Sequence, residues 1–170
     1  MPRGPVVIGL LRETEVDDYI GFRSGADSSE IRRRLEAGQR FFVARHEGRI
    51  IHGEWVATQR AWIDYLACEI RLAPDEVYVY DSFTSPDFRG RNISPARSTQ
   101  ALRYIRDAGY RRIMAAILLE NKPAFRVFEK VGFRPLGLMD YVKIGPWRRD
   151  FCRVEWPGNG RKRVSYKPLS

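Results

Sequence analysis

The chain has 170 residues, of which 44% are hydrophobic, and it carries a formal net charge of +9 at pH 7. That length suits one domain with a full hydrophobic core, and no apolar run is long enough to span a bilayer. The N-terminal apolar run is too short for a signal peptide, so a cytoplasmic protein without a membrane partner is expected. The spacing of Cys68 and Cys152 argues against a disulfide scaffold and against a zinc site.

The first third of the chain alternates apolar runs with turn and cap residues. Apolar runs bounded by Gly, Asp or Ser predict buried strands, and the spacing of apolar residues between them predicts helices. The expected elements are a strand at 5–11, a helix capped at Thr14, a helix from Asp27 or Ser28 to Gly38, and a hairpin with strands 41–45 and 50–57.

Residues 58–73 carry two competing patterns. Ala61, Tyr65 and Cys68 fall at helical spacing, whereas residues 69–72 alternate between polar and apolar side chains as a strand does. We expect a short helix followed by a strand that pairs with residues 77–84.

Residues 77–108 predict a strand, a turn and a helix. Residues 77–80 are β-branched or aromatic, and Pro86 stops the strand. Ser94 is a suitable N-cap for a helix that begins at Pro95. The turn before this helix carries Arg89 and Arg91, and a helix N-terminus also attracts anions. This segment therefore predicts a site for a phosphate or a pyrophosphate.

The last third of the chain predicts a second strand-helix unit and a basic end. Residues 112–119 form an apolar run typical of a buried parallel strand, and Asn121 can cap a helix that ends at Gly132. Residues 133–144 are expected to form one or two strands, and a further strand is expected around residues 151–156. Between residues 143 and 170 there are eight basic and two acidic side chains.

Two motifs carry a resemblance to a known family. The turn Pro86-Asp87-Phe88-Arg89-Gly90-Arg91 and the segment Asn121-Lys122-Pro123-Ala124, which continues to Gly132-Phe133, occur in this order and separation. Together they resemble the cofactor-binding motifs of the GNAT superfamily of N-acetyltransferases. Asn92 and Ser94 stand where the family has glycine and a small residue, and Phe128 stands where it has tyrosine.

The resemblance implies an α/β (α+β) fold with a mixed, centrally splayed sheet of about six to seven strands and helices on both faces. It implies acetyl-CoA as co-substrate and no metal. Residues 1–146 would form the acyl-CoA-binding domain, and residues 147–170 a basic C-terminal extension. The positions implied for CoA binding are Ser82, Phe83, Thr84, Arg89, Gly90, Arg91, Asn92, Ile93, Ser94, Asn121, Ala124 and Phe128.

The general base and the general acid are less directly indicated. Asp81 lies on one of the two strands expected to splay apart and Glu120 at the end of the other, so either could take the proton of an amine. The alternative for Asp81 is a carboxylate paired with arginine, and for Glu120 a surface acid. Because Phe128 has no hydroxyl, the thiolate leaves unassisted or another hydroxyl, from Tyr80, Ser82 or Tyr141, protonates it.

The leading expectation is an N-acetyltransferase that acts on a primary amine of a small molecule or a protein. The alternative is a CoA-binding regulatory module whose basic tail contacts nucleic acid or an acidic partner. Nucleic acid is the less favoured partner, since the tail has no regular interleaving of aromatic and basic residues. Homodimers are common among proteins that resemble this one, and the sequence leaves the oligomeric state open.

Overall fold

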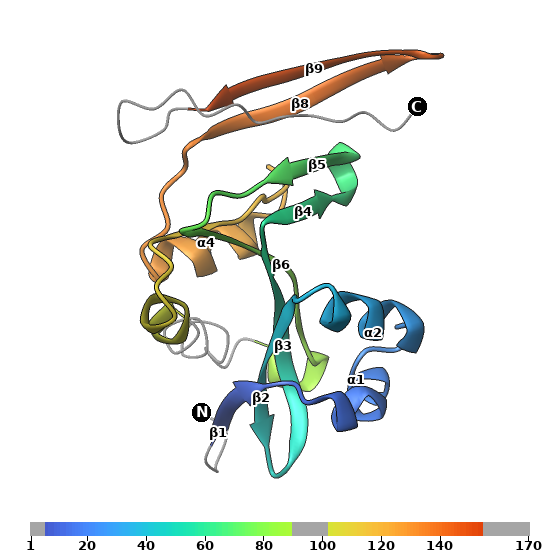
Figure 1. Cartoon of the computed structure of the whole chain (residues 1–170), viewed down its shortest axis with the longest axis vertical. Helices are drawn as coiled ribbons and strands as arrows, with labels where there is room; N and C mark the ends of the chain where they lie inside the picture. The colour runs from blue at the N-terminus through green and yellow to red at the C-terminus, as the bar shows by residue number, and fades with distance from the viewer. Residues whose placement is uncertain (1–5, 90–101, 155–170) are drawn as a thin grey trace.

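The structure is a computed structural model that describes residues 6–89 and 102–154 of the chain (Figure 1). Residues 102–107 are helical. The other elements are β1 (Val6–Leu10), η1 (Glu13–Glu15), α1 (Val16–Phe22), α2 (Ser28–Glu36), β2 (Arg40–His46), β3 (Arg49–Thr58), β4 (Arg60–Ile63), η2 (Asp64–Leu66), β5 (Cys68–Arg71), β6 (Glu76–Thr84), η3 (Pro86–Phe88), β7 (Arg112–Met114), α4 (Lys122–Lys130), β8 (Gly137–Ile144) and β9 (Trp147–Val154).

A five-stranded sheet in the order β1-β2-β3-β6-β7 forms the centre of the molecule. Neighbouring strands are antiparallel except for β6 and β7, which are parallel. The mixed α/β class is therefore confirmed. This sheet holds fewer strands than expected, because the other described strands form two separate hairpins, β4–β5 and β8–β9.

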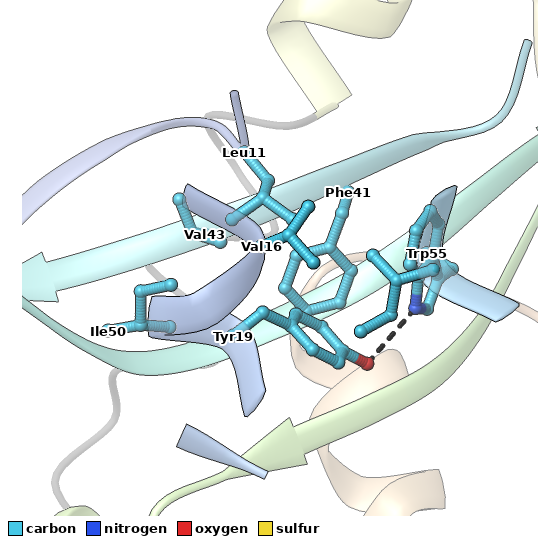
Figure 2. Close-up of a cluster of buried hydrophobic side chains, with 8 residues drawn as sticks. Leu11, Val16, Tyr19, Phe41, Val43, Ile50 and Trp55 are labelled. Atoms are coloured by element: carbon cyan, nitrogen blue, oxygen red, sulfur yellow. Dashed lines mark hydrogen bonds between the residues drawn. The ribbon is translucent and has the colours of Figure 1, made fainter. Parts of the chain in front are cut away.

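Helices α1 and α2 cover one face of the sheet (Figure 1). Their apolar residues pack on β2 and β3 around Phe41 and Trp55, which are 1% and 0% exposed. Figure 2 shows Tyr19 of α1 beside these rings, with the indole Nε1 of Trp55 donating a hydrogen bond of 3.2 Å to the Tyr19 hydroxyl. This bond satisfies two polar groups that would otherwise be buried without partners.

The opposite face carries the helical residues 102–107 and α4 (Figure 1). Ile105 is buried against side chains of β2, β3 and β6, among them Phe42 and Val77, and Phe128 of α4 packs at the border of this cluster. The sheet is thus covered on both sides, as a largely apolar sheet requires.

The N-terminal elements confirm the expected order and correct one cap. Asp27 caps α2 as expected, accepting a hydrogen bond of 2.9 Å from the backbone N–H of Ser29. Thr14 is not a cap, because it lies inside the 3-10 turn η1. Instead Glu15 accepts hydrogen bonds from the backbone N–H of Arg12 at 2.8 Å and from Arg45 at 2.6 Å. The carboxylate thereby joins the turn before α1 to β2, and no side chain caps α1 itself.

The segment 58–73 forms a hairpin, which contradicts the expected helix, whereas the expected strand is present as β5 with a different partner. β4 and β5 pair with each other, and β6 pairs with β3 instead. Ala61 and Ile63 on β4 and Cys68 and Ile70 on β5 are buried together, so burial follows the two-residue period of a strand. Ala61 and Cys68 are seven residues apart, as on a helical face, but they are buried because they lie on the same side of the two paired strands.

The hairpin β8–β9 lies beyond β4–β5 (Figure 1). Its two strands pair along their whole length, from Gly137 opposite Val154 to Ile144 opposite Trp147. Arg148 joins it to the β4–β5 hairpin by donating hydrogen bonds to the backbone oxygens of Leu66 and Ala67. The expected strand near residues 151–156 therefore begins earlier, at Trp147, and the division of the chain at residue 146 stays a prediction.

Candidate functional site

The parallel strands β6 and β7 part after a short contact. They pair only from Glu76 opposite Arg112 to Tyr78 opposite Met114, whereas β6 continues to Thr84. The expected strand at 112–119 is therefore only three residues long, and its pairing with β6 ends at Met114. Within the described residues, the edge of β6 from Val79 to Thr84 that would face β7 pairs with no strand. Its backbone polar groups can therefore bind a ligand.

A bulge at Asp81 shapes this open part of β6. The register with β3 shifts between Gly53 and Trp55, and Asp81 has a φ of 53°. Its carboxylate forms ion pairs with Arg23 and, at 3.1 Å, with Arg34. The arginine-paired alternative for Asp81 thus matches the structure, and its role as a base stays a prediction.

The side chains of Ser82, Phe83 and Thr84, which follow Asp81 on β6, point alternately to the two faces of the sheet. The ring of Phe83 packs edge-on against Phe22 of α1 at 5.2 Å between centroids. The hydroxyl of Thr84 lies 2.5 Å from Nδ1 of His52, while Ser82 is exposed. Ser82 and the backbone, rather than the Phe83 ring, are therefore available to a ligand in the opening.

Arg89 lies directly after β6 and η3. Its Nε donates a hydrogen bond of 3.2 Å to the backbone oxygen of Thr84, and its guanidinium lies over the ring of Phe83. This positions a positive charge at the end of the open strand. The other expected pyrophosphate residues, Gly90, Arg91, Asn92, Ile93 and Ser94, lie outside the described residues.

Helix α4 follows residues 115–120 and has the N-terminal cap expected at Asn121. The Asn121 side chain accepts a hydrogen bond of 3.3 Å from the backbone N–H of Ala124. Glu120 lies exposed in the turn just before it. Phe128 packs edge-on against Phe133, with 4.8 Å between ring centroids.

A cavity of about 870 Å³ opens beside the point where β6 and β7 part. It is lined by the β4–β5 hairpin, β6 and β7, residues 115–120, α4 and residues 133–141. Glu120, Phe128 and Tyr141 all line it, whereas Asp81 does not. The ring of Tyr141 is held in place by the guanidinium of Arg148, 4.3 Å from its centroid.

Tyr65 and Tyr78 also line this cavity, and sequence reasoning did not select them. The hydroxyl of Tyr78 is hydrogen-bonded to the hydroxyl of Tyr65 and to the backbone of Ala116. Burial raises the pKa of Tyr65 to about 12 and raises the pKa of Tyr78 further, so both keep their protons at neutral pH. No local motif marks either residue, since the contact joins an insertion to a strand.

Comparison with known proteins identifies this arrangement. The sequence model of the acetyltransferase (GNAT) family matches residues 9–133, which is most of the chain. The chain belongs to this family. An uncharacterized N-acetyltransferase of Methanocaldococcus jannaschii is 31% identical over 93 residues, which cover 55% of this chain and 38% of that protein. A relative from Bacillus subtilis is 32% identical over 78 residues, which cover 46% of this chain and 48% of that protein. The match therefore spans less than half the length of each of these two relatives.

Solved structures agree on the GNAT fold. An aminoglycoside N-acetyltransferase crystallised with CoA has a TM-score of 0.63 at 18% identity, with 96% of this chain and 99% of that chain covered. An aminoglycoside 6'-N-acetyltransferase from Acinetobacter baumannii has a TM-score of 0.63 at 12% identity, with 83% of this chain and 99% of that chain covered. At these identities the likeness concerns the fold.

The open edge of β6 fits the acetyl-CoA co-substrate of a GNAT protein. Among the described residues, backbone groups without a strand partner line one side, Ser82 is exposed, and Arg89 places a positive charge at the end of the strand. Within residues 6–89 and 102–154 no cluster of His, Cys, Asp and Glu could hold a metal ion. In the same part of the chain, no helix has the length and apolarity that a membrane span requires.

Proposed function

We propose that this GNAT protein transfers an acetyl group from acetyl-CoA to a primary amine. The observation that carries the proposal is the parting of β6 and β7 after Tyr78, which leaves an open strand edge next to a large cavity. Backbone N–H groups on that edge can polarise the thioester carbonyl and stabilise the oxyanion as the amine attacks it.

Glu120 is the base that the geometry supports best. It lines the cavity and is exposed, so it can receive the ammonium proton directly or through water. Asp81 is the weaker candidate because two arginines already occupy its carboxylate. As the C–S bond breaks, the thiolate takes up a proton, for which we propose the Tyr141 hydroxyl as donor. The second proton that the attacking nitrogen loses then restores this hydroxyl through water.

The test is a thiol-release assay with acetyl-CoA and a panel of primary amines, with mass spectrometry of the product. We expect amine-dependent release of CoA and a product that carries one added acetyl group. Glu120→Gln is expected to lower kcat by about 100-fold, the low end of the contribution of a general base. Glu129→Gln, a second acid of the cavity lining, serves as the matched variant. Thiol release that is independent of every amine would contradict the proposal.

A second candidate is a CoA-binding module with little turnover, and Phe128 is the observation that favours it. Its ring packs against Phe133 and carries no hydroxyl, so helix α4 offers no proton donor at this position. This module would contact nucleic acid or an acidic partner through its basic C-terminal tail. Tight CoA binding without turnover on any amine, together with salt-sensitive binding to nucleic acid, would select this candidate.

A further inference from the structure

The cavity is lined by the first part of β6, at Glu76 and Tyr78, and not by the open part of this strand that is expected to bind CoA. Ser82, Phe83, Thr84 and Arg89 do not line it, although they are the described residues next to the open edge of β6. Phe128 does line it, and the family resemblance places this residue beside the leaving sulfur. The cavity therefore begins where the thioester would end.

Most of the cavity wall is apolar. Its volume of about 870 Å³ lies within the range of ordinary small-molecule sites, about 300–1,000 Å³. Aliphatic and aromatic side chains come from four separate parts of the chain. They include Ile63 and Leu66, Met114 and Ile117, Phe125, and Met139. Such a wall favours an apolar chain or ring.

The charges around the cavity nearly balance. The lining contains four acids, Glu76, Glu120, Glu129 and Asp140, and two arginines, Arg71 and Arg134. Glu76 is already engaged, because its carboxylate accepts a hydrogen bond of 2.7 Å from Ala73 and lies 3.4 Å from Arg112. The remaining surplus of negative charge suits one ammonium group and not several.

From these observations we propose that the cavity binds the acceptor, and that the acceptor is a monoamine with an apolar chain or ring. This inference rests on the proposed acetyl transfer. It assigns the amine end of the acceptor to the region of Glu120 and Phe128, and the apolar part to the wall formed by the β4–β5 hairpin and residues 133–141. A polycation such as an aminoglycoside would leave most of its charges against apolar surface.

Binding is tested without turnover, by calorimetric titration of 2-phenylethylamine into the full chain saturated with CoA. Leu118→Lys places a cation in the lining, and Val142→Lys is its control, because the two residues are 43% and 45% exposed and Val142 is not part of the lining. We expect Leu118→Lys to weaken amine binding by about tenfold or more, because the lysine ammonium repels the ammonium group of the ligand. The control is expected to bind as the unaltered protein does.

The outcomes separate this inference from the acetyl transfer itself. Equal amine binding by both variants would overturn the placement of the acceptor in the cavity. Acetylation of kanamycin with a higher kcat/KM than 2-phenylethylamine would overturn the acceptor class while leaving acetyl transfer intact. If CoA binds but 2-phenylethylamine does not, the apolar acceptor is wrong. If CoA itself fails to bind to the folded protein, the proposed function fails first.

Discussion

Asp81 combines a left-handed backbone with two arginine partners. A φ of 53° is costly for most residues, and aspartate and asparagine tolerate it best. Arg23, which follows α1, and Arg34 of α2 reach its carboxylate from the face of the sheet that these two helices cover. The ion pairs therefore fix the bulge to α1 and α2. We interpret Asp81 as the residue that holds the bulge of β6.

Asp81→Asn is expected to lower the free energy of unfolding by about 1 kcal/mol, the upper range for ion pairs of this exposure. Asp81→Ala should cost roughly 1–2 kcal/mol more, because alanine also loses the tolerance of a left-handed backbone. Urea denaturation measures both. Asp107→Asn, in the exposed pair with Arg106, is the control and should change little. Equal stability of all three variants would contradict this role.

Loss of kcat in Asp81→Asn with unchanged stability would restore Asp81 as the base.

Phe128 lines the cavity with a ring that has no hydroxyl, so it supplies no proton to the leaving thiolate of the proposed transfer. A thiol pKa near 8.5 makes the thiolate a fair leaving group without help. If its departure still limits turnover, Phe128→Tyr should raise kcat by about tenfold or more, as expected of an added general acid. Phe125→Tyr adds a hydroxyl to the same cavity from the same helix and should not. A kcat unchanged in both variants would mean that another step is limiting.

Glu15 links the start of the chain to the sheet in a pH-dependent way. Burial raises its pKa, but hydrogen bonds from Arg12 and the charge of Arg45 outweigh burial and lower it. A lowered pKa in the folded state gives stability that is present above about pH 4.5 and is lost as the pH falls. Denaturation at pH 6 and pH 3.5 should show a smaller loss for Glu15→Gln than for the unaltered protein. An equal loss would mean that the ion pair contributes nothing.

Gly53 on β3 lies directly against Phe41 and Phe42 of β2. An added Cβ there would overlap the ring of Phe41 and lie 2.9 Å from the backbone oxygen of Phe42. Gly53→Ala should therefore lower the free energy of unfolding by about 1–3 kcal/mol, the usual cost of overpacking. Gly9→Ala on β1, where the nearest atom is 3.8 Å away, is the matched control in a strand. Equal midpoint temperatures of Gly53→Ala and Gly9→Ala in thermal denaturation would contradict the close packing of Gly53 against Phe41.

The local spacing of apolar and capping residues predicted most of these helices and strands. It failed where the pairing of one strand with another had to be predicted. Asp27 and Asn121 act as caps because their effect depends only on residues two or three positions away. In residues 58–73, the burial of Ala61 and Cys68 suits either a helix or a strand. A two-residue period also cannot tell whether β5 pairs with β4 or with β6, since any antiparallel neighbour satisfies it.

The family and the fold class were predicted through the two motifs, while the cavity was not. The motifs at Pro86–Arg91 and Asn121–Phe133 are local, so neighbouring residues in the sequence suffice to recognise them. The cavity depends on contacts between residues far apart in the chain, such as Arg148 with Leu66. Tyr65 and Tyr78 meet only because the β4–β5 hairpin folds over β6. Sequence periodicity contains no information of this kind.

Calorimetric titration with acetyl-CoA tests the account most directly. We predict tight binding by the unaltered protein and binding weakened at least about tenfold in Arg89→Ala, which removes a charge-assisted phosphate contact. Arg40→Ala, an exposed arginine at the start of β2, is the control and should bind normally. Absence of acetyl-CoA binding to the folded protein, or equal binding by all three, would contradict the site at the end of β6.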